Sequence, residues 1–359
     1  MRALLLSAAL LILATPPAQA QDIACVRPLE ATAPDSPHRP YEQLARGEGV
    51  AVAVIDTGIN PHPHLGEVEP VADLVTPHTP DPHLDCDGHG TIVAGVIRDI
   101  APGARMMSIR QSSAHYREQS GGTLETLTHG IHAALDAGAR VINVSVVSCL
   151  DPSLLLDARL LHDALHRAEA EDAVIVAAAG NAGGPCQPGM AVYPAQEETV
   201  LAVSALHHGD PHALADYVLP GGELAATGSV PVAPAPHGHG WARGTVNAHG
   251  QEAAFEGTSF AAPQVAGVAA LLIERHPHAS AAEIRTLIHQ AAEPGHGVVD
   301  PHTTLSHVSG HYEVMGREVS VDKQEKPETT TGRTARTVLL AAAGAALLIA
   351  LSRAGWRRA

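Results

Sequence analysis

The sequence predicts an α/β protein in which a mostly parallel central sheet lies between two layers of helices. Short apolar runs of strand length recur along the chain, segments with helical spacing alternate with them, and glycines often separate the two. Strands of a parallel sheet read as continuous apolar runs because helices cover both faces of the sheet. In such sheets the functional groups gather at the carboxyl ends of the strands.

The alternation extends over residues 44–308, which we interpret as one domain, long enough to bury a substantial core. The first strand is expected at 50–55, where an apolar run ends in Asp-Thr-Gly. Ser280 and Glu283 have the spacing of a capping box at the start of the last helix. Further strands are expected at 104–109, 141–147, 173–179 and 200–205, and helices at 91–99, 124–137, 153–170, 260–276 and 281–292.

The N-terminus has the features of a cleaved export signal. A positive start precedes an apolar run, and Ala-Gln-Ala at 18–20 supplies the small residues at which a signal peptidase cuts. We therefore predict that 1–20 are a signal peptide rather than a helix of the folded domain. Residues 21–43 are rich in proline and histidine and are interpreted as an irregular N-terminal extension.

The C-terminus carries a second apolar stretch. Residues 337–352 have no charged side chain, and as a helix they would span roughly 24 Å. Snorkelling of Arg353 would extend the usable segment to Trp356, so we predict one transmembrane helix at 337–356. The alternative of a buried core helix is disfavoured by the arginines on both sides.

The flanking segments follow from this span. Residues 309–336 are interpreted as a charged, threonine-rich linker, and 357–359 as a short cytoplasmic tail, with the main domain outside the cell membrane. A cell-wall sorting signal at 326–330 is a second alternative, but the segment lacks the leucine and glycine of such a signal.

Composition and charge narrow the function classes. The formal net charge of −16 argues against nucleic acid as a partner. Four cysteines in an exported chain indicate two disulfides, with three possible pairings. The 24 histidines include close pairs, but no cysteine or carboxylate framework accompanies them at a metal-ligand spacing. We predict neither a metal site nor a cofactor.

Three segments place a reactive side chain where this architecture gathers such groups. Asp56 ends the first strand, His89 stands at a helix entry between glycines, and Ser259 begins an alanine-rich helix. A serine hydroxyl is a weak nucleophile, which needs a base to take its proton and a carboxylate to orient that base. Asn181 ends another strand, and its amide would hold an oxyanion together with the backbone N–H of Ser259.

Each of these segments is weak when taken alone. An Asp-Thr-Gly also occurs in aspartic proteases, which need two copies where this chain has one. An isolated Asn181 would more often be a turn residue, and an isolated Gly-Thr-Ser a helix N-cap. The four together, in this order, predict nucleophilic catalysis by a Ser-His-Asp triad.

In these motifs the chain resembles the subtilisin-like serine proteases, whose triad runs in the order Asp, His, Ser. The matching segments are VIDTG at 54–58, HGTIVAG at 89–95, AGN at 179–181 and GTSFAAP at 257–263. Within that family it is similar to the mycosins, the membrane-anchored proteases of type VII secretion systems. The shared features are a signal peptide, a short extension with a cysteine, Cys86 before the histidine motif, and one C-terminal span.

The resemblance implies a membrane-anchored, extracytoplasmic serine endopeptidase with a three-layer sandwich and a protein or peptide substrate. It also implies substrate-binding roles for Ser145, Val146, Ala179 and Gly180. Two departures are Ile92, where secreted subtilisins commonly have a second histidine, and Val147, where a glycine is usual. The valine would narrow the subsites. The extension is also too short for an inhibitory propeptide.

The mycosin resemblance also implies a type VII secretion membrane complex as a partner. It leaves open an alternative in which the protein is mainly a structural subunit of that complex and proteolysis is secondary. A third interpretation, a general nutritional protease, needs release from the cell and is opposed by the predicted span.

The cysteine positions favour one pairing. Cys149 and Cys186 follow strands that we expect to be parallel neighbours, which would leave both at one edge of the sheet. Cys25 would then pair with Cys86 and hold the extension near the histidine loop. The alternative is four unpaired thiols.

Overall fold

The computed structural model describes residues 24–35, 39–115, 122–153, 158–184, 186–308, 339–343 and 346. The chain divides into two units, Met1–Ser309 and Gly310–Ala359. The predicted signal peptide, the linker, the cytoplasmic tail and most of the predicted transmembrane helix lie outside the described residues. Among the residues that are described, no helix is both long and apolar enough to cross a membrane.

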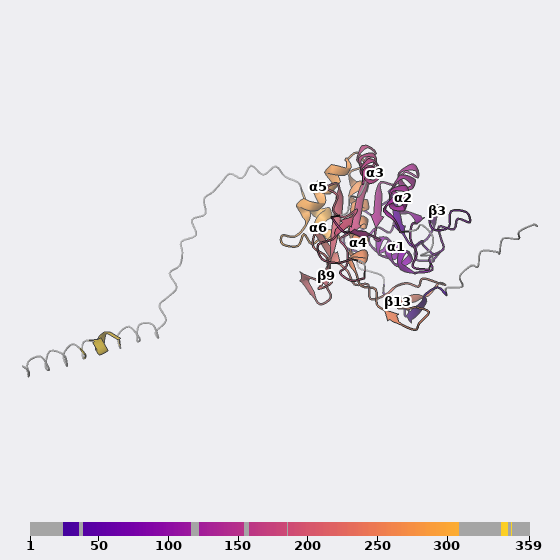
Figure 1. Cartoon of the computed structure of the whole chain (residues 1–359). Helices are drawn as coiled ribbons and strands as arrows, with labels where there is room; N and C mark the ends of the chain where they lie inside the picture. The colour runs from indigo at the N-terminus through magenta and orange to yellow at the C-terminus, as the bar shows by residue number, and fades with distance from the viewer. Residues whose placement is uncertain are drawn as a thin grey trace, which may run out of the picture. The chain divides into compact units, whose positions relative to one another are not determined.

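An eight-stranded sheet forms the centre of the first unit (Figure 1). Its strand order is β10-β9-β7-β5-β2-β4-β3, and β11 also pairs with β9. All of these pairs are parallel except β10 with β9, so the sheet is mixed. The strands are β2 (Ala51–Asp56), β3 (Val68–Asp73), β4 (Arg105–Arg110), β5 (Val141–Val144), β7 (Val174–Ala178), β9 (Val200–His207), β10 (Asp210–Leu214) and β11 (Leu224–Thr227).

Helices cover both faces of this sheet because successive side chains of each strand point to opposite sides. Along β2, Val52 and Val54 belong to one buried cluster, and Ala53 and Ile55 belong to the other. The first cluster takes its helical residues from α1 (His89–Ile100), α4 (Thr258–Arg275), α5 (Ala281–Ala291) and α6 (Pro301–Ser306). The second takes them from α2 (Leu124–Asp136) and α3 (Arg159–Ala170). The predicted three-layer α/β fold is confirmed.

The central helix α4 is apolar all round. Every residue from Thr258 to Ile273 is buried except Gln264, as expected for a helix enclosed in the core. The predicted helix at 260–276 therefore begins two residues earlier, and its first turn includes Ser259. This places a hydroxyl at the carboxyl end of the sheet.

The N-terminal extension is partly regular, so its interpretation as an irregular segment is wrong. Strand β1 (Arg27–Ala31) pairs antiparallel with β13 (Trp241–Val246), which also pairs with β12 (Ala233–Pro234) and β14 (Glu252–Ala253). The strand has no buried residue, so it shows no clear apolar alternation. Its regularity comes from a partner far along the chain.

Two disulfides join the cysteines that the sequence analysis pairs. Cys25 is bonded to Cys86, and Cys149 to Cys186. The second bond joins β6 (Ser148–Leu150) to the segment before β8 (Ala191–Tyr193), and these two strands pair antiparallel. The predicted strand at 141–147 is therefore too long, because β5 ends at Val144 and the next strand, β6, begins only at Ser148.

Candidate active site

The end of β2 and the start of α1 bring a carboxylate and an imidazole together. Asp56 is fully buried as the last residue of β2, and His89 is the first residue of α1. The two side chains are joined by a 2.7 Å contact between His89 Nδ1 and Asp56 Oδ1. The approach requires a glycine at position 90, because a Cβ there would collide with the carbonyl oxygen of Gly58.

A backbone donor also orients the Asp56 carboxylate. Asp56 Oδ1 also accepts a hydrogen bond from the backbone N–H of Thr57 at 2.8 Å, and Thr57 Oγ1 lies 3.2 Å from the same oxygen. A carboxylate held in this way favours the imidazole tautomer with a proton on Nδ1, which leaves Nε2 free to accept a proton.

A cavity of about 690 Å³ opens beside this pair, and His89, Asn181 and Ser259 all line it. Ser259 is 8% exposed in the first turn of α4. The ring centroid of Phe260, its neighbour in the chain, lies 5.1 Å from that of His89. A Cβ placed on Gly257 would lie 2.9 Å from Asn181 Nδ2 and 3.1 Å from Ser259 Oγ. The amide nitrogen and the hydroxyl therefore face the same space.

The Asn181 side chain is oriented by its own oxygen. Asn181 Oδ1 accepts hydrogen bonds from the backbone N–H and the hydroxyl of Thr258, both at 3.0 Å. A backbone N–H can only donate, so the atom that faces it must be the amide oxygen. The amide NH₂ is consequently turned toward Ser259, as an oxyanion donor requires.

The charges around His89 favour its protonated form. Burial by itself lowers the pKa of His89, but the charge and hydrogen bond of Asp56 raise it, and so do the charges of Asp85 and Asp87. The net result is a pKa above the ordinary value of a histidine. An imidazole with a raised pKa is a stronger base for a neighbouring hydroxyl.

The residues predicted to bind substrate do not all line this cavity. Ser145, Val146 and Gly180 do, but the Ser145 hydroxyl donates to the carbonyl of Ser259 at 2.8 Å. Ala179 is buried and lines a separate cavity of about 130 Å³. Ala178 lines the main cavity instead. Successive side chains of a strand point to opposite sides, so a shift by one residue exchanges a side chain that faces the cavity for one that faces away from it.

Several polar residues near the site were not identified from the sequence. Thr258 anchors Asn181 and also accepts the Gly180 N–H at 3.1 Å. Thr57 and Thr91 both bond to Asp85, a carboxylate with no exposed surface. The only sequence signal was their position, since each threonine lies within two residues of Asp56, His89 or Ser259.

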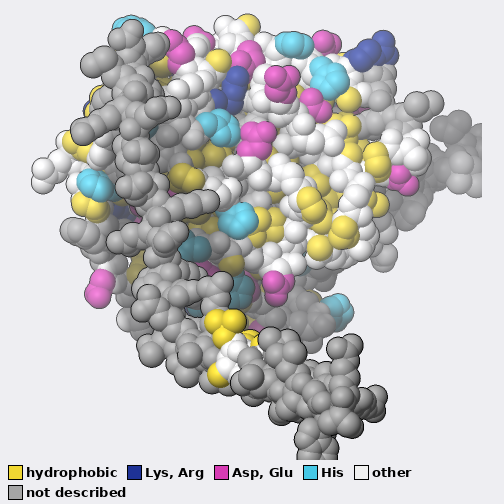
Figure 2. Space-filling model, turned by 90° about the vertical axis from the view of Figure 1, so that its left-hand side faces the viewer, with side chains coloured by type: hydrophobic (Ala, Val, Ile, Leu, Met, Phe, Trp, Pro, Cys, Tyr) yellow, Lys and Arg dark blue, Asp and Glu magenta, His cyan; other side chains and the backbone are white. Residues whose placement is uncertain are grey.

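The histidines of the described residues do not gather into a metal site. No group of three or more histidine, cysteine, aspartate or glutamate side chains in that part of the chain has the arrangement needed to hold a metal ion. On the face shown in Figure 2, histidine side chains are dispersed among acidic ones.

Comparisons with known proteins identify the family of this chain. A profile of the Subtilase family (Peptidase S8) matches residues 47–333. The chain belongs to the Subtilase family. This subtilase is 36% identical over 305 residues to Mycosin-4 of Mycobacterium tuberculosis, across 74% of its own length and 66% of the relative's. It thus spans about two thirds of that relative.

Solved structures show the same fold. The MycP3 protease from the type VII (ESX-3) secretion system matches with a TM-score of 0.69 at 30% identity, over 79% of this subtilase and 92% of that chain. A chain in the structure of an intact ESX-5 inner membrane complex matches with a TM-score of 0.70 at 27% identity, over 94% of each. The resemblance to mycosins inferred from the sequence is confirmed.

Proposed function

We propose that this subtilase is a serine endopeptidase whose catalytic triad is Asp56, His89 and Ser259, with Asn181 as an oxyanion donor. The observation that carries the proposal is the shared cavity, in which the Ser259 hydroxyl and the Asn181 amide face one space beside His89. The buried carboxylate of Asp56 lies behind that imidazole at 2.7 Å. Family membership supports the same chemistry.

The proposed reaction uses these groups in two stages. His89 Nε2 takes the hydroxyl proton while Ser259 Oγ bonds to the peptide carbonyl carbon, and the resulting oxyanion is held by the Asn181 amide and the Ser259 N–H. The C–N bond then breaks as the imidazolium gives its proton to the leaving amine. Water repeats the sequence on the acyl-enzyme, which releases the acid and restores Ser259.

The decisive experiment replaces Ser259 with alanine. We expect the wild-type protein to hydrolyse a denatured protein substrate and to be labelled by a fluorophosphonate, and Ser259→Ala to lose both properties. Ser153→Ala, which removes an exposed hydroxyl, is the matched control and should behave as wild type. Hydrolysis by Ser259→Ala at the wild-type rate would refute the proposal.

The proposed location is the outer face of the cell membrane. It rests on a signal peptide at 1–20, a linker at 309–336, a transmembrane helix at 337–356 and a cytoplasmic tail at 357–359. The likeness to a chain of an inner membrane complex supports this arrangement. The test is fractionation of the cells, in which the full chain should remain in the membrane after a high-salt wash and a chain ending at 308 should be released.

A role in type VII secretion is proposed on the similarity to MycP3 and to the ESX-5 chain. The second of these matches favours an alternative in which the protein mainly stabilises a secretion complex. Cells that carry Ser259→Ala separate the two roles. Normal secretion in those cells would identify the structural role as the essential one, whereas loss of secretion with an intact complex would identify proteolysis.

A further inference from the structure

Asp85 lies four residues before His89 and has no exposed surface. We propose that Asp85 is a positioning residue, which aligns the Asp56–His89 pair by tying the end of β2 to the start of α1. The inference rests on the proposed function, in which that pair activates Ser259. It assigns a task to a carboxylate that the proposed reaction itself does not use.

Four hydrogen bonds converge on the Asp85 carboxylate. Oδ1 accepts from the Thr57 hydroxyl at 2.7 Å and from the Gly88 N–H at 2.8 Å. Oδ2 accepts from the Thr91 N–H at 2.8 Å and from its hydroxyl at 2.7 Å. All four donors are neutral. Both oxygens are therefore fully engaged. Thr57 directly follows β2, whereas Gly88 is the N-cap of α1 and Thr91 lies in its first turn.

Asp85 takes the place of a cap for α1. The N-cap residue of that helix is Gly88, which has no side chain to offer, and the first turn contains no acidic residue. The first backbone N–H groups of a helix need an acceptor, and a negative charge at this end is favourable. The carboxylate supplies both, so it holds the helix turn that begins with His89.

The Thr57 hydroxyl connects the two carboxylates. Its oxygen lies 2.7 Å from Asp85 Oδ1 and 3.2 Å from Asp56 Oδ1, and it accepts the Gly90 N–H at 3.0 Å. A hydroxyl has one proton to donate, and the shorter contact assigns that proton to Asp85. Asp56 Oδ1 therefore keeps its acceptor capacity for the Thr57 N–H and His89.

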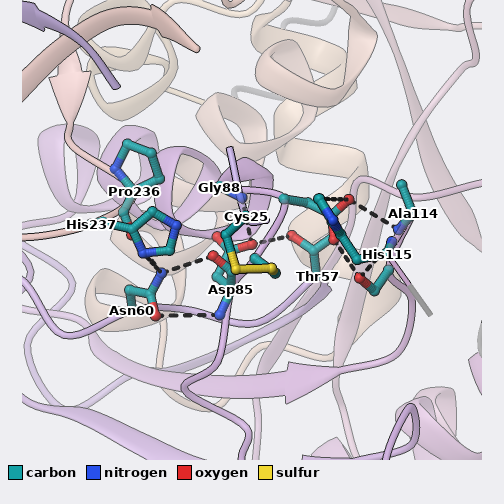
Figure 3. Close-up of a disulfide and its surroundings, with 12 residues drawn as sticks. Cys25, Thr57, Asn60, Asp85, Gly88, Ala114, His115, Pro236 and His237 are labelled. Carbon is teal, nitrogen blue, oxygen red and sulfur yellow. Dashed lines mark hydrogen bonds and ion pairs between the residues drawn. A yellow bond between two sulfur atoms is a disulfide. The ribbon is translucent and has the colours of Figure 1, made fainter. Parts of the chain in front are cut away.

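The backbone around Asp85 is held from outside as well (Figure 3). The Asn60 amide accepts from the Asp85 N–H at 3.3 Å and donates to its carbonyl at 2.8 Å. The next residue, Cys86, is bonded to Cys25, and its carbonyl accepts the Val26 N–H at 3.0 Å. The position of the carboxylate is thus determined by the extension as well as by the domain.

A second buried carboxylate shows what a purely structural role looks like. Asp73 also has no exposed side-chain surface, and it pairs with the buried guanidinium of Arg110 at 3.0 Å. Removing one partner of a buried ion pair strongly lowers the stability of the protein. The Asp73–Arg110 pair has no imidazole as a partner, so its loss should not affect the proposed base. Asp73 is therefore the matched control for Asp85.

The test replaces Asp85 with asparagine, which keeps the shape but presents an amide NH₂ to the two donors that one of the carboxylate oxygens now accepts. We expect kcat/KM to fall on the order of 10- to 100-fold, mostly in kcat, because small displacements of reacting groups are costly. Activity is normalised to the number of sites that a fluorophosphonate labels. Asp73→Asn should lower the melting temperature but leave kcat/KM per labelled site unchanged.

A pH profile supplies a readout that a loss of stability would not move. The charged groups that face this network are Asp56 on β2, His89 on α1, and Asp87 with the nearby His115. Burial raises the pKa of Asp85 to about 6, so its charge is present above that pH and there raises the pKa of His89. Asp85→Asn should therefore move the acid limb of kcat/KM to lower pH. Asp73→Asn should leave the limb in place.

Thr57 variants test the connection without removing the carboxylate. Thr57→Val should reproduce part of the loss in kcat, Thr57→Ser should recover most of it, and the Asp85→Asn/Thr57→Val double variant should lose less than the two single losses combined. If Asp85→Asn does not fold, the Thr57→Val and Thr57→Ser variants test the proposal by themselves. Additive losses in the double variant, or an Asp85→Asn variant with wild-type kcat/KM and acid limb, would overturn the proposal.

The test also separates this inference from the proposed function. The imidazole of His89 can be titrated by NMR in the Ser259→Ala protein, whether or not the wild type hydrolyses a peptide. A lower pKa of His89 on Asp85→Asn supports the coupling of Asp85 to the Asp56–His89 pair, and an unchanged pKa contradicts it. Failure of the proposed function would instead appear as an absence of Ser259-dependent hydrolysis.

Discussion

At Asn181 the fold orients an amide by occupying its oxygen. The two hydrogen bonds from Thr258 leave only the NH₂ to face the cavity. An asparagine on the surface would have no such role, because the orientation of the Asn181 amide depends on the residues around it.

We expect Asn181→Ala to lower kcat by about 100- to 1,000-fold with little change in KM, or about 2.7–4 kcal/mol, a range measured for such a donor in another subtilase. The reason is that the oxyanion forms only after the substrate has bound. Thr258→Val, which removes one of two anchors of the Asn181 oxygen, should cause a smaller loss. Steady-state kinetics on a peptide substrate is the measurement, and a rise in KM alone would contradict the assigned role.

The raised pKa of His89 predicts the pH dependence of the wild-type enzyme. The base must be neutral to accept a proton, so kcat/KM should rise with pH through the pKa of His89 in the free enzyme. That pKa is raised, and the midpoint should therefore lie above about 6.5, the ordinary value for histidine. A midpoint below that value would show that burial outweighs the carboxylates.

At the scale of the elements, the contact between α1 and α4 positions the proposed base relative to the proposed nucleophile. Gly267 of α4 packs directly on Ile100 of α1, and a Cβ at 267 would lie 2.6 Å from the Ile100 Cβ and Cγ2. The two helices can come this close only because one of them has no side chain there.

Gly267→Ala should lower the free energy of unfolding, because overpacking costs typically about 1–3 kcal/mol and exceeds the roughly 1 kcal/mol that alanine gains in a helix. Denaturant unfolding measures the effect. A Gly240→Ala variant, which meets no atom within 4 Å, is the control and should be nearly neutral. Equal stability of both glycine variants would disprove the contact.

At the scale of the whole molecule, two disulfides hold distant segments to the domain. The Cys25–Cys86 bond spans 61 residues and the Cys149–Cys186 bond spans 37. Loop-closure entropy predicts a stabilisation on the order of 4 kcal/mol for each. The two bonds differ in position, since only the first adjoins Asp85.

Serine pairs in place of each disulfide separate stability from alignment. Both double variants should unfold at lower denaturant concentration. Only Cys25→Ser/Cys86→Ser should also lower kcat per active site, because it frees the backbone next to Asp85, and the loss should be smaller than that of Asp85→Asn. Kinetics at a temperature where both variants are folded is the measurement. Equal activity of the two variants would mean that the extension does not influence the site.

Much of the fold was predictable because its signals are local. The apolar residues of a run such as 50–55 are enough to predict that the strand is buried. The capping box at Ser280 and Glu283 is present as predicted. The motifs around Asp56, His89 and Ser259 are likewise contiguous, and parallel neighbouring strands were enough to pair Cys149 with Cys186.

What the sequence determined by itself was therefore the order of five strands of the central sheet and five helices, the family, the candidate catalytic residues and the cysteine pairs. Only the tertiary structure decided that β1 is a strand, that Ala178 rather than Ala179 lines the cavity, and that the Asn181 amide faces Ser259. It alone revealed the hydrogen bonds of Asp85. The reason is physical. Burial and periodicity can be recognised from the types of consecutive residues, whereas a hydrogen bond between segments far apart in the chain produces no pattern in the sequence of either segment.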